Sequence, residues 1–248
     1  MNDSFPRTAE TELRRMLLRV QQQHAERAAD ANLAARLTRL ADWQSRRLGQ
    51  TYADLGADAR YAAAVRFFQD DLYGPADFTR RDDDVARIVP LLVKLLPERV
   101  VATVAEAMEL NALSQDFDRR MLAALPGLER AFSVAEYCAA FRRVDDLPGR
   151  NRQVALVVDI GRALDQYVKR PLIRAALAMM RGPAHLAGYG VMHDFLERGF
   201  AAFHRMHGAE IFLSTIAARE VALFDAIMAG DDAPFPDPAA PSTATPVT

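Results

Sequence analysis

Apolar residues recur every three to five positions along most of this 248-residue chain, and no segment shows the alternation typical of a β-strand. In the first segment they fall at Leu13, Met16, Leu17 and Val20, and the same spacing resumes at Leu33. This period is that of an amphipathic α-helix. Alanine, the strongest helix former, occurs 45 times. The pattern therefore predicts an all-α protein.

Proline, glycine and aspartate divide this pattern into about eight to ten helices. We expect a single multi-helix domain with orthogonal or bundle-like packing over residues 1–229. Within it, residues 8–55 are predicted to form a long amphipathic hairpin or bent helix that breaks near Asp30–Asn32, and residues 59–229 the helical core. Residues 230–248 are rich in Pro, Ala, Ser and Thr, which predicts a disordered tail.

Several helix ends can be placed from single residues. Ser133 followed three positions later by Glu136 has the spacing of a capping box, so a helix is expected to begin at residue 134. The tripeptide at 147–149, Leu-Pro-Gly, predicts a turn, and Arg-Gly-Pro at 181–183 predicts a break. Pro171 is expected to bend or break the helix that contains it.

Bulk properties exclude several classes of protein. The chain has one cysteine, Cys138, so neither an intrachain disulfide nor a cysteine-rich zinc site can form. No stretch of about 18 apolar residues predicts a transmembrane helix, and the N-terminus lacks the features of a secretory signal. We therefore expect a cytoplasmic protein with no membrane association. A net charge of −2 excludes a strongly basic nucleic-acid binder.

The segment Phe67–Tyr73 reads FFQDDLY and is followed by Gly74-Pro75. It resembles the hallmark of the bacterial FFLEELY-motif proteins, an uncharacterised family, with Gln-Asp-Asp in place of Leu-Glu-Glu. The resemblance implies a helical domain of unknown function and transfers no activity, cofactor or catalytic residue. The residues of this motif are Phe67, Phe68, Asp70, Asp71, Leu72, Tyr73, Gly74 and Pro75.

Two interpretations of this motif remain open. In the first, the aromatic residues anchor the core, and Asp70 or Asp71 pairs with a nearby arginine such as Arg80 or Arg81. In the second, the two aspartates form the acidic rim of a pocket or of a groove for a partner.

Metal and cofactor sites find little support in the sequence. The chain contains no Glu-x-x-His unit, which argues against a carboxylate-bridged di-metal centre. Glu106 and Glu109 share a helix face but are expected to pair with some of the 29 arginines. We therefore predict no metal site and no cofactor.

Four of the five histidines lead to the same prediction of no metal site and no cofactor. His204 and His207 lie at a predicted helix end near Gly208, where a solvated histidine is common. His185 and His193 flank a glycine-rich turn, but no distal partner for a haem can be identified.

Three functions remain. The leading hypothesis is a non-enzymatic adaptor, regulator or scaffold that binds an unknown protein partner, with a homodimer through the N-terminal helices as one arrangement. An alternative is a small-ligand-binding protein or enzyme whose site lies between helices. A third is a weak nucleic-acid binder that uses the basic segment Arg142–Arg181, although this partner is not favoured. The site of the second hypothesis would be lined by Asp70, Asp71, His193 and Glu197.

Overall fold

The computed structural model describes residues 8–72, 84, 87, 89, 97–125 and 131–238. These residues contain ten α-helices, one π-helical turn and no strand, which confirms the predicted all-α class. None of these helices is long and apolar enough to cross a membrane. The elements are α1 (Ala9–Ala29), α2 (Ala31–Thr51), α3 (Ala53–Ala57), α4 (Ala62–Phe67), η1 (Phe68–Leu72), α6 (Glu98–Ala124), α7 (Val134–Val144), α8 (Leu147–Val168), α9 (Pro171–Leu186), α10 (Gly190–Arg205) and α11 (Glu210–Met228).

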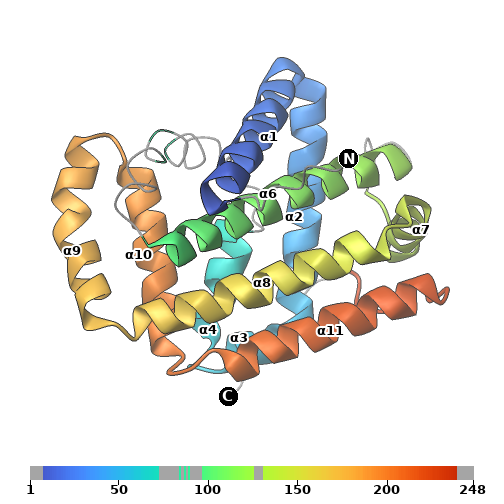
Figure 1. Ribbon diagram of the computed structural model, residues 1–248. Coiled ribbons are helices and arrows are strands. Elements are labelled where there is room, and N and C mark those ends of the chain that lie inside the picture. The colour runs from blue at the N-terminus through green and yellow to red at the C-terminus, as the bar shows by residue number, and fades with distance from the viewer. Residues whose placement is uncertain are drawn as a thin grey trace, which may run out of the picture.

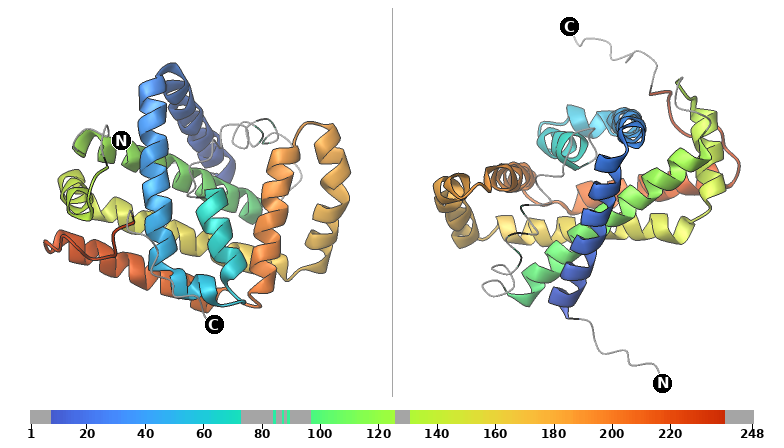
Figure 2. Two further views of the ribbon diagram at one scale, coloured as in Figure 1. Left: turned by 180° about the vertical axis from the view of Figure 1, so that it is seen from behind. Right: turned by 90° about the horizontal axis from the view of Figure 1, so that it is seen from above.

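Helices α6, α8 and α11 lie side by side across the molecule, and α2, α4 and α10 cross them at a steep angle (Figure 1). The pair α9 and α10 lies at one edge in both further views (Figure 2). Helix α1 packs along α6, and Leu13, Met16 and Val20 are buried there against Val101 and Met108. The apolar stripe of α1 is therefore covered within the chain. A homodimer through the N-terminal helices stays a prediction.

The N-terminal segment folds back on itself because Asp30 serves two helices. Asp30 is the C-cap of α1. It is also the N-cap of α2, where its side chain accepts hydrogen bonds from the backbone N–H groups of Asn32 and Leu33. An aspartate at this position satisfies donors that the first helical turn leaves unpaired. The segment is thus a helical hairpin.

Two predicted breaks are helical in the structure. Residues 147–149 form the first turn of α8, because Asp146 accepts from the backbone N–H of Gly149 at 2.9 Å and a proline is tolerated in a first turn. Helix α9 continues through 181–183 with Pro183 inside it. At Pro171 the chain does break, since α8 ends at Val168. Helix α7 begins at Val134 behind the predicted capping box.

The packed chain extends beyond residue 229, where the sequence predicted a disordered tail. Phe235 is only 8% exposed and joins the core cluster that contains Trp43 and Tyr137. Its ring centroid lies 6.0 Å from that of Trp43 and 6.1 Å from that of Tyr137. Backbone oxygens of this segment also accept hydrogen bonds, that of Asp231 from Arg142 and that of Asp237 from Gln50. The segment is therefore packed as far as residue 238, and residues 239–248 lie outside the described part.

Candidate functional site

The FFQDDLY segment connects α10 and α11 to the centre of the fold. Phe67 is buried and packs so closely on Gly199 that a Cβ atom there would lie 2.9 Å from the phenyl ring. Phe68 contacts Phe212 edge-on, with ring centroids 5.6 Å apart. The aromatic pair is therefore a core anchor, as the first interpretation of the motif holds. Tyr73, Gly74 and Pro75 lie outside the described residues.

Each residue of the predicted polar site has its own surroundings in the structure. Asp70 is exposed, and each of the other three contacts a different partner. These contacts are Arg198 Nη2 to Asp71 at 2.6 Å, Arg181 to Glu197 at 3.5 Å, and His193 Nε2 to the Leu177 carbonyl at 2.8 Å. The partner of Asp71 comes from α10, whereas Arg80 and Arg81 lie outside the described residues.

A cavity of about 210 Å³ lies among α2, α6, α8 and α11, and Phe68 and Gln69 of the motif contribute to its wall. One water molecule needs only about 10–15 Å³ of such space, so the cavity has room for a small organic molecule. Its apolar side is formed by Leu37, Leu48, Val154, Val157, Phe212, Ile216 and Phe224. Its neutral polar side is formed by Gln44, Asn111, Ser114, Gln115 and Gln153.

A buried ion pair closes the cavity between α2 and α11. Arg47 donates two hydrogen bonds to the Glu220 carboxylate, at 2.6 and 3.0 Å, and the Tyr52 hydroxyl donates a third at 2.7 Å. Burial alone would raise the pKa of Glu220, but the charge and hydrogen bonds of Arg47 lower it overall. The two charges compensate each other, so the pair supplies no free charge to the cavity, although Arg47 Nε has no hydrogen-bond partner among the described residues.

Arg150, on α8, is a buried cation that forms no ion pair within 4.0 Å with the residues that the structure describes. It is 8% exposed, and its guanidinium lies 3.9 Å from the centroid of the Phe117 ring and 4.9 Å from that of Phe141. Nη1 donates to Gln153 Oε1 at 3.2 Å, whereas Nη2 has no hydrogen-bond partner among the described residues. Burial lowers the pKa of Arg150, yet a guanidinium keeps its proton in proteins.

Asp118 is another charged group on the cavity wall, and it forms no ion pair within the described chain. Burial raises its pKa to about 6, although Arg150 and a hydrogen bond with Gln44 act in the opposite direction. Its carboxylate therefore changes charge near neutral pH. Below about pH 6 the cavity has the Arg150 charge without a compensating anion at Asp118.

The basic segment Arg142–Arg181 does not form one face. Its residues are distributed over α7, α8 and α9, and Arg150 points inward to line the cavity. Two of its arginines pair with glutamates, Arg152 with Glu109 at 2.7 Å and Arg162 with Glu210 at 2.6 Å. The sequence could not separate Arg150 from its neighbours, because only the tertiary fold buries it.

Comparison with known proteins adds a family but no activity. A family model described as "Domain of unknown function (DUF8198)" matches residues 23–234. No curated protein and no solved structure matches the chain. The matched range contains every residue that lines the cavity, from His24 on α1 to Phe224 on α11.

Proposed function

The chain belongs to the family of the domain of unknown function DUF8198, and we propose that it binds a small organic anion in the central cavity. The observation that carries this proposal is Arg150, whose buried Nη2 has no protein partner in the described residues and lies at the cavity wall. A buried guanidinium nitrogen without a hydrogen-bond partner is costly, because it has lost its hydration. A carboxylate or phosphate oxygen would restore a charge-assisted hydrogen bond.

The remainder of the wall fits the same class of ligand. Phe212, Ile216 and Phe224 form an apolar surface, whereas Asn111 and Gln115, which are hydrogen-bonded to each other at 3.0 Å, add neutral polar groups to the wall. Ligand sites commonly combine a largely apolar lining with a few placed polar groups. This cavity differs from the site that the sequence suggested, because none of the four residues of that site lines it.

A thermal-shift experiment tests the proposal. The full-length protein is heated with a panel of small carboxylates and phosphate monoesters, and a ligand at 100 times its Kd should stabilise the folded state by about 2.7 kcal/mol. Arg150→Met replaces the buried cation by an apolar side chain, so it should keep the fold and lose the response. Arg162→Met, on the same helix but exposed, is the matched control.

The proposal fails if no member of the panel stabilises the wild-type protein, or if Arg150→Met responds as strongly as the wild type. A response lost in both Arg150→Met and Arg162→Met would also contradict it, because the effect would then be one of general surface charge.

We also propose a second function, an adaptor that binds a partner protein through α9. This helix has no buried residue. Leu172, Met179 and Leu186 recur every seventh position on it and are 85%, 74% and 92% exposed. Such spacing is typical of the seam between two packed helices. We further propose that the protein is a bacterial FFLEELY-motif protein and that it acts in the cytoplasm.

The charges beside this α9 stripe indicate which partner fits. Arg170 and Arg174 are exposed, have no ion pair in the described chain, and no acidic residue lies on α9. A second copy packed through its own α9, parallel or antiparallel, would offer these arginines no carboxylate, because α9 contains no acidic residue. The proposed occupant is therefore an amphipathic helix of another protein with acidic residues beside its apolar stripe.

A photocrosslinker at position 179 tests this adaptor function in the native host. We expect the crosslinked product to contain a protein with an acidic amphipathic helix. That helix, in isolation, should bind the purified chain, and both Arg174→Glu and added salt should weaken the binding. Leu18→Ser, which changes an exposed residue on α1, should leave binding unchanged, whereas Leu172→Ser should abolish it. Equal capture by Leu172→Ser, or a homodimer crosslinked through position 179, would refute it.

A further inference from the structure

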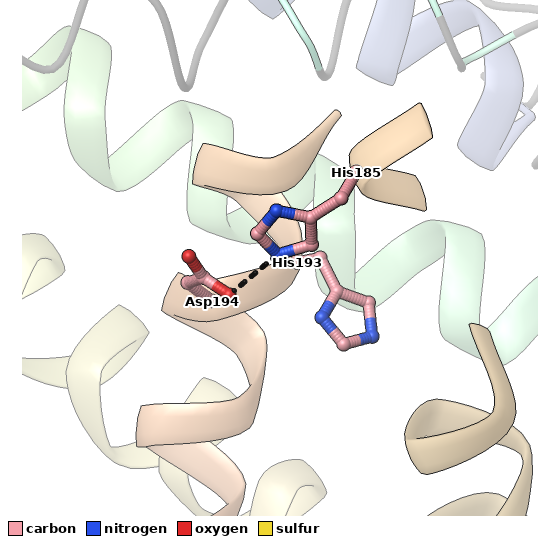
Figure 3. A group of neighbouring side chains, drawn as sticks. All are labelled: His185, His193 and Asp194. Carbon is pink, nitrogen blue, oxygen red and sulfur yellow. Dashed lines mark hydrogen bonds and ion pairs between the residues drawn. The ribbon is translucent and has the colours of Figure 1, made fainter. Parts of the chain in front are cut away.

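Two histidines and one aspartate meet where α9 turns into α10. His185 lies in the last turn of α9, and His193 and Asp194 lie in the first turns of α10. Figure 3 shows the three side chains gathered in one place, with His185 beside Asp194. His185 Nε2 and Asp194 Oδ1 are 3.0 Å apart, and one ligand atom from each of the three residues lies within 4.8 Å of the others. None of them lines the central cavity.

The hydrogen bond of His193 prepares its other ring nitrogen for a metal ion. Its Nε2 lies 2.8 Å from the backbone carbonyl of Leu177, and a carbonyl can only accept, so Nε2 holds the proton. In the neutral imidazole, Nδ1 then has a free lone pair. The residue is 5% exposed, and Nδ1 has no hydrogen-bond partner among the residues described. Histidines that bind metals commonly donate their second N–H to a carbonyl in this way.

The backbone makes room for His185. A Cβ atom at position 190 would lie 2.7 Å from His185 Nδ1, so only glycine allows the imidazole to approach the start of α10 this closely. Gly188, with a φ of +83°, provides the left-handed residue of the turn between the helices. The glycine-rich turn therefore brings His185 back over α10.

We propose that His185, His193 and Asp194 bind a divalent zinc-like cation. Two imidazoles and a carboxylate suit Zn²⁺ and its neighbours in the first transition series, whereas Mg²⁺ and Ca²⁺ prefer oxygen ligands alone. Ligand atoms around a tetrahedral zinc ion lie about 3.3 Å apart. His185 and Asp194 are both partly exposed, so rotation of their side chains closes the remaining gap. A fourth position stays open to water or to a partner's side chain.

The proposed ion would join α9 to the rest of the molecule. Helix α9 has no buried residue, while His193 and Asp194 belong to α10, which packs on α4 and α8. Because the ion binds the folded hairpin and not the unfolded chain, it would stabilise α9 in its present position. This inference is independent of the anion proposed for the central cavity.

Titration of the untagged, chelator-treated protein with ZnCl₂ tests the site. Calorimetry should show one ion per chain, and Co²⁺ should give the visible absorption of a tetrahedral site. His185→Ala and Asp194→Asn should each weaken binding by at least about tenfold. Gly190→Ala should weaken it as well, although all three ligands remain.

The double variant His204→Ala with His207→Ala is the control, because these two exposed histidines are also close neighbours, with ring centroids 6.1 Å apart. Binding should be unchanged in this double variant. The inference is overturned if the wild-type protein binds no Zn²⁺, if the two ligand variants bind as tightly as the wild type, or if binding disappears in the His204/His207 variant.

Discussion

Asp118 illustrates how the fold changes the chemistry of one residue. Its pKa is raised to about 6 by burial, whereas an aspartate in the unfolded chain titrates near 3.9. Between these values the folded state binds more protons than the unfolded state. The free energy of unfolding therefore falls as the pH rises from about 4 to about 6, and above this range the ionised carboxylate remains a cost.

Asp118→Asn should accordingly stabilise the protein at pH 7.5 by roughly 1–2 kcal/mol, because the amide cannot ionise and can still accept from Gln44. The gain should be about half as large at pH 5. Urea unfolding at both pH values measures it, and Asp70→Asn at an exposed position is the control. An equal gain at both pH values would show that Asp118 is not a titrating group in this range.

Gly199 and Gly182 allow one chemical change to be compared at two positions. Gly199→Ala should destabilise the protein by about 1–3 kcal/mol, because the new Cβ would lie 2.9 Å from the Phe67 ring in a packed core. Gly182→Ala, at an exposed position, should stay within about 0.5 kcal/mol of the wild type. Beyond its chain neighbours its Cβ would meet no atom within 4 Å, but Pro183 disfavours the helical conformation of a preceding residue that has a Cβ, which offsets the helix preference of alanine. Thermal unfolding compares the two variants, and a Gly199→Ala variant as stable as the wild type would contradict the packing of Phe67.

At the scale of elements, a helix end that depends on a few neighbouring residues could be predicted from sequence. The effect of a proline, which depends on its position within the helix, could not. Ser133 and Glu136 define the start of α7 through two reciprocal hydrogen bonds, so four residues suffice to place it. Pro148 and Pro183 look alike in the sequence as breakers, yet both lie within helices. Asp146 supplies the N-cap that makes Pro148 an acceptable first-turn residue, and this role becomes clear only when the helix itself is known.

The FFQDDLY motif likewise has features that could be predicted from sequence and features that could not. Its aromatic residues could be predicted as a core anchor from their spacing, and Phe67 is buried. Its π-helical geometry and the distant partner of Asp71 could not, because Arg198 lies 127 positions away and belongs to α10. Prediction from sequence fails here for a simple reason: 29 arginines offer many partners, and only the fold selects one.

Asp71 and Asp70 should therefore differ although they are adjacent and chemically identical. Asp71→Asn weakens the bidentate contact that ties η1 to Arg198 of α10, so it should cost about 1 kcal/mol. Asp70→Asn should stay within about 0.5 kcal/mol of the wild type, because this residue is exposed. Chemical denaturation compares the two, and equal losses would mean that the acidic pair stabilises the protein through overall charge.

At the scale of the whole molecule, the candidate site depends on contacts between distant parts of the chain. The cavity wall takes residues from α1 through α11, so no local window of sequence contains it. Arg150 could be listed as one basic residue among nine in its segment, but its burial follows from the packing of α8 against α6 and α7. A long-range site of this kind can be predicted only once the helices have been placed.

The segment after α11 should contribute to the stability of the whole fold. Phe235→Ala removes a ring from the cluster around Trp43, so it should lower stability by about 2–4 kcal/mol, near the usual range for a buried phenylalanine. Because Trp43 is the only tryptophan, its fluorescence should report greater exposure to water. Pro236→Ala, at an exposed neighbour, should change neither value. An unaltered emission spectrum in Phe235→Ala would contradict this packing.

The ion pair of Arg47 and Glu220 joins α2, near the start of the chain, to α11, near its end. Glu220→Leu leaves a buried guanidinium without its carboxylate and should cost about 3–5 kcal/mol, and Arg47→Met should be comparably damaging. The double variant should recover most of this loss, because no buried charge then lacks its partner. A double-mutant cycle in urea therefore should give a large coupling energy. The exposed pair of Arg162 and Glu210 is the control and should give a coupling energy of at most about 1 kcal/mol in the same cycle. Additive losses for the buried pair would show that the two ends of the chain are not joined through these charges.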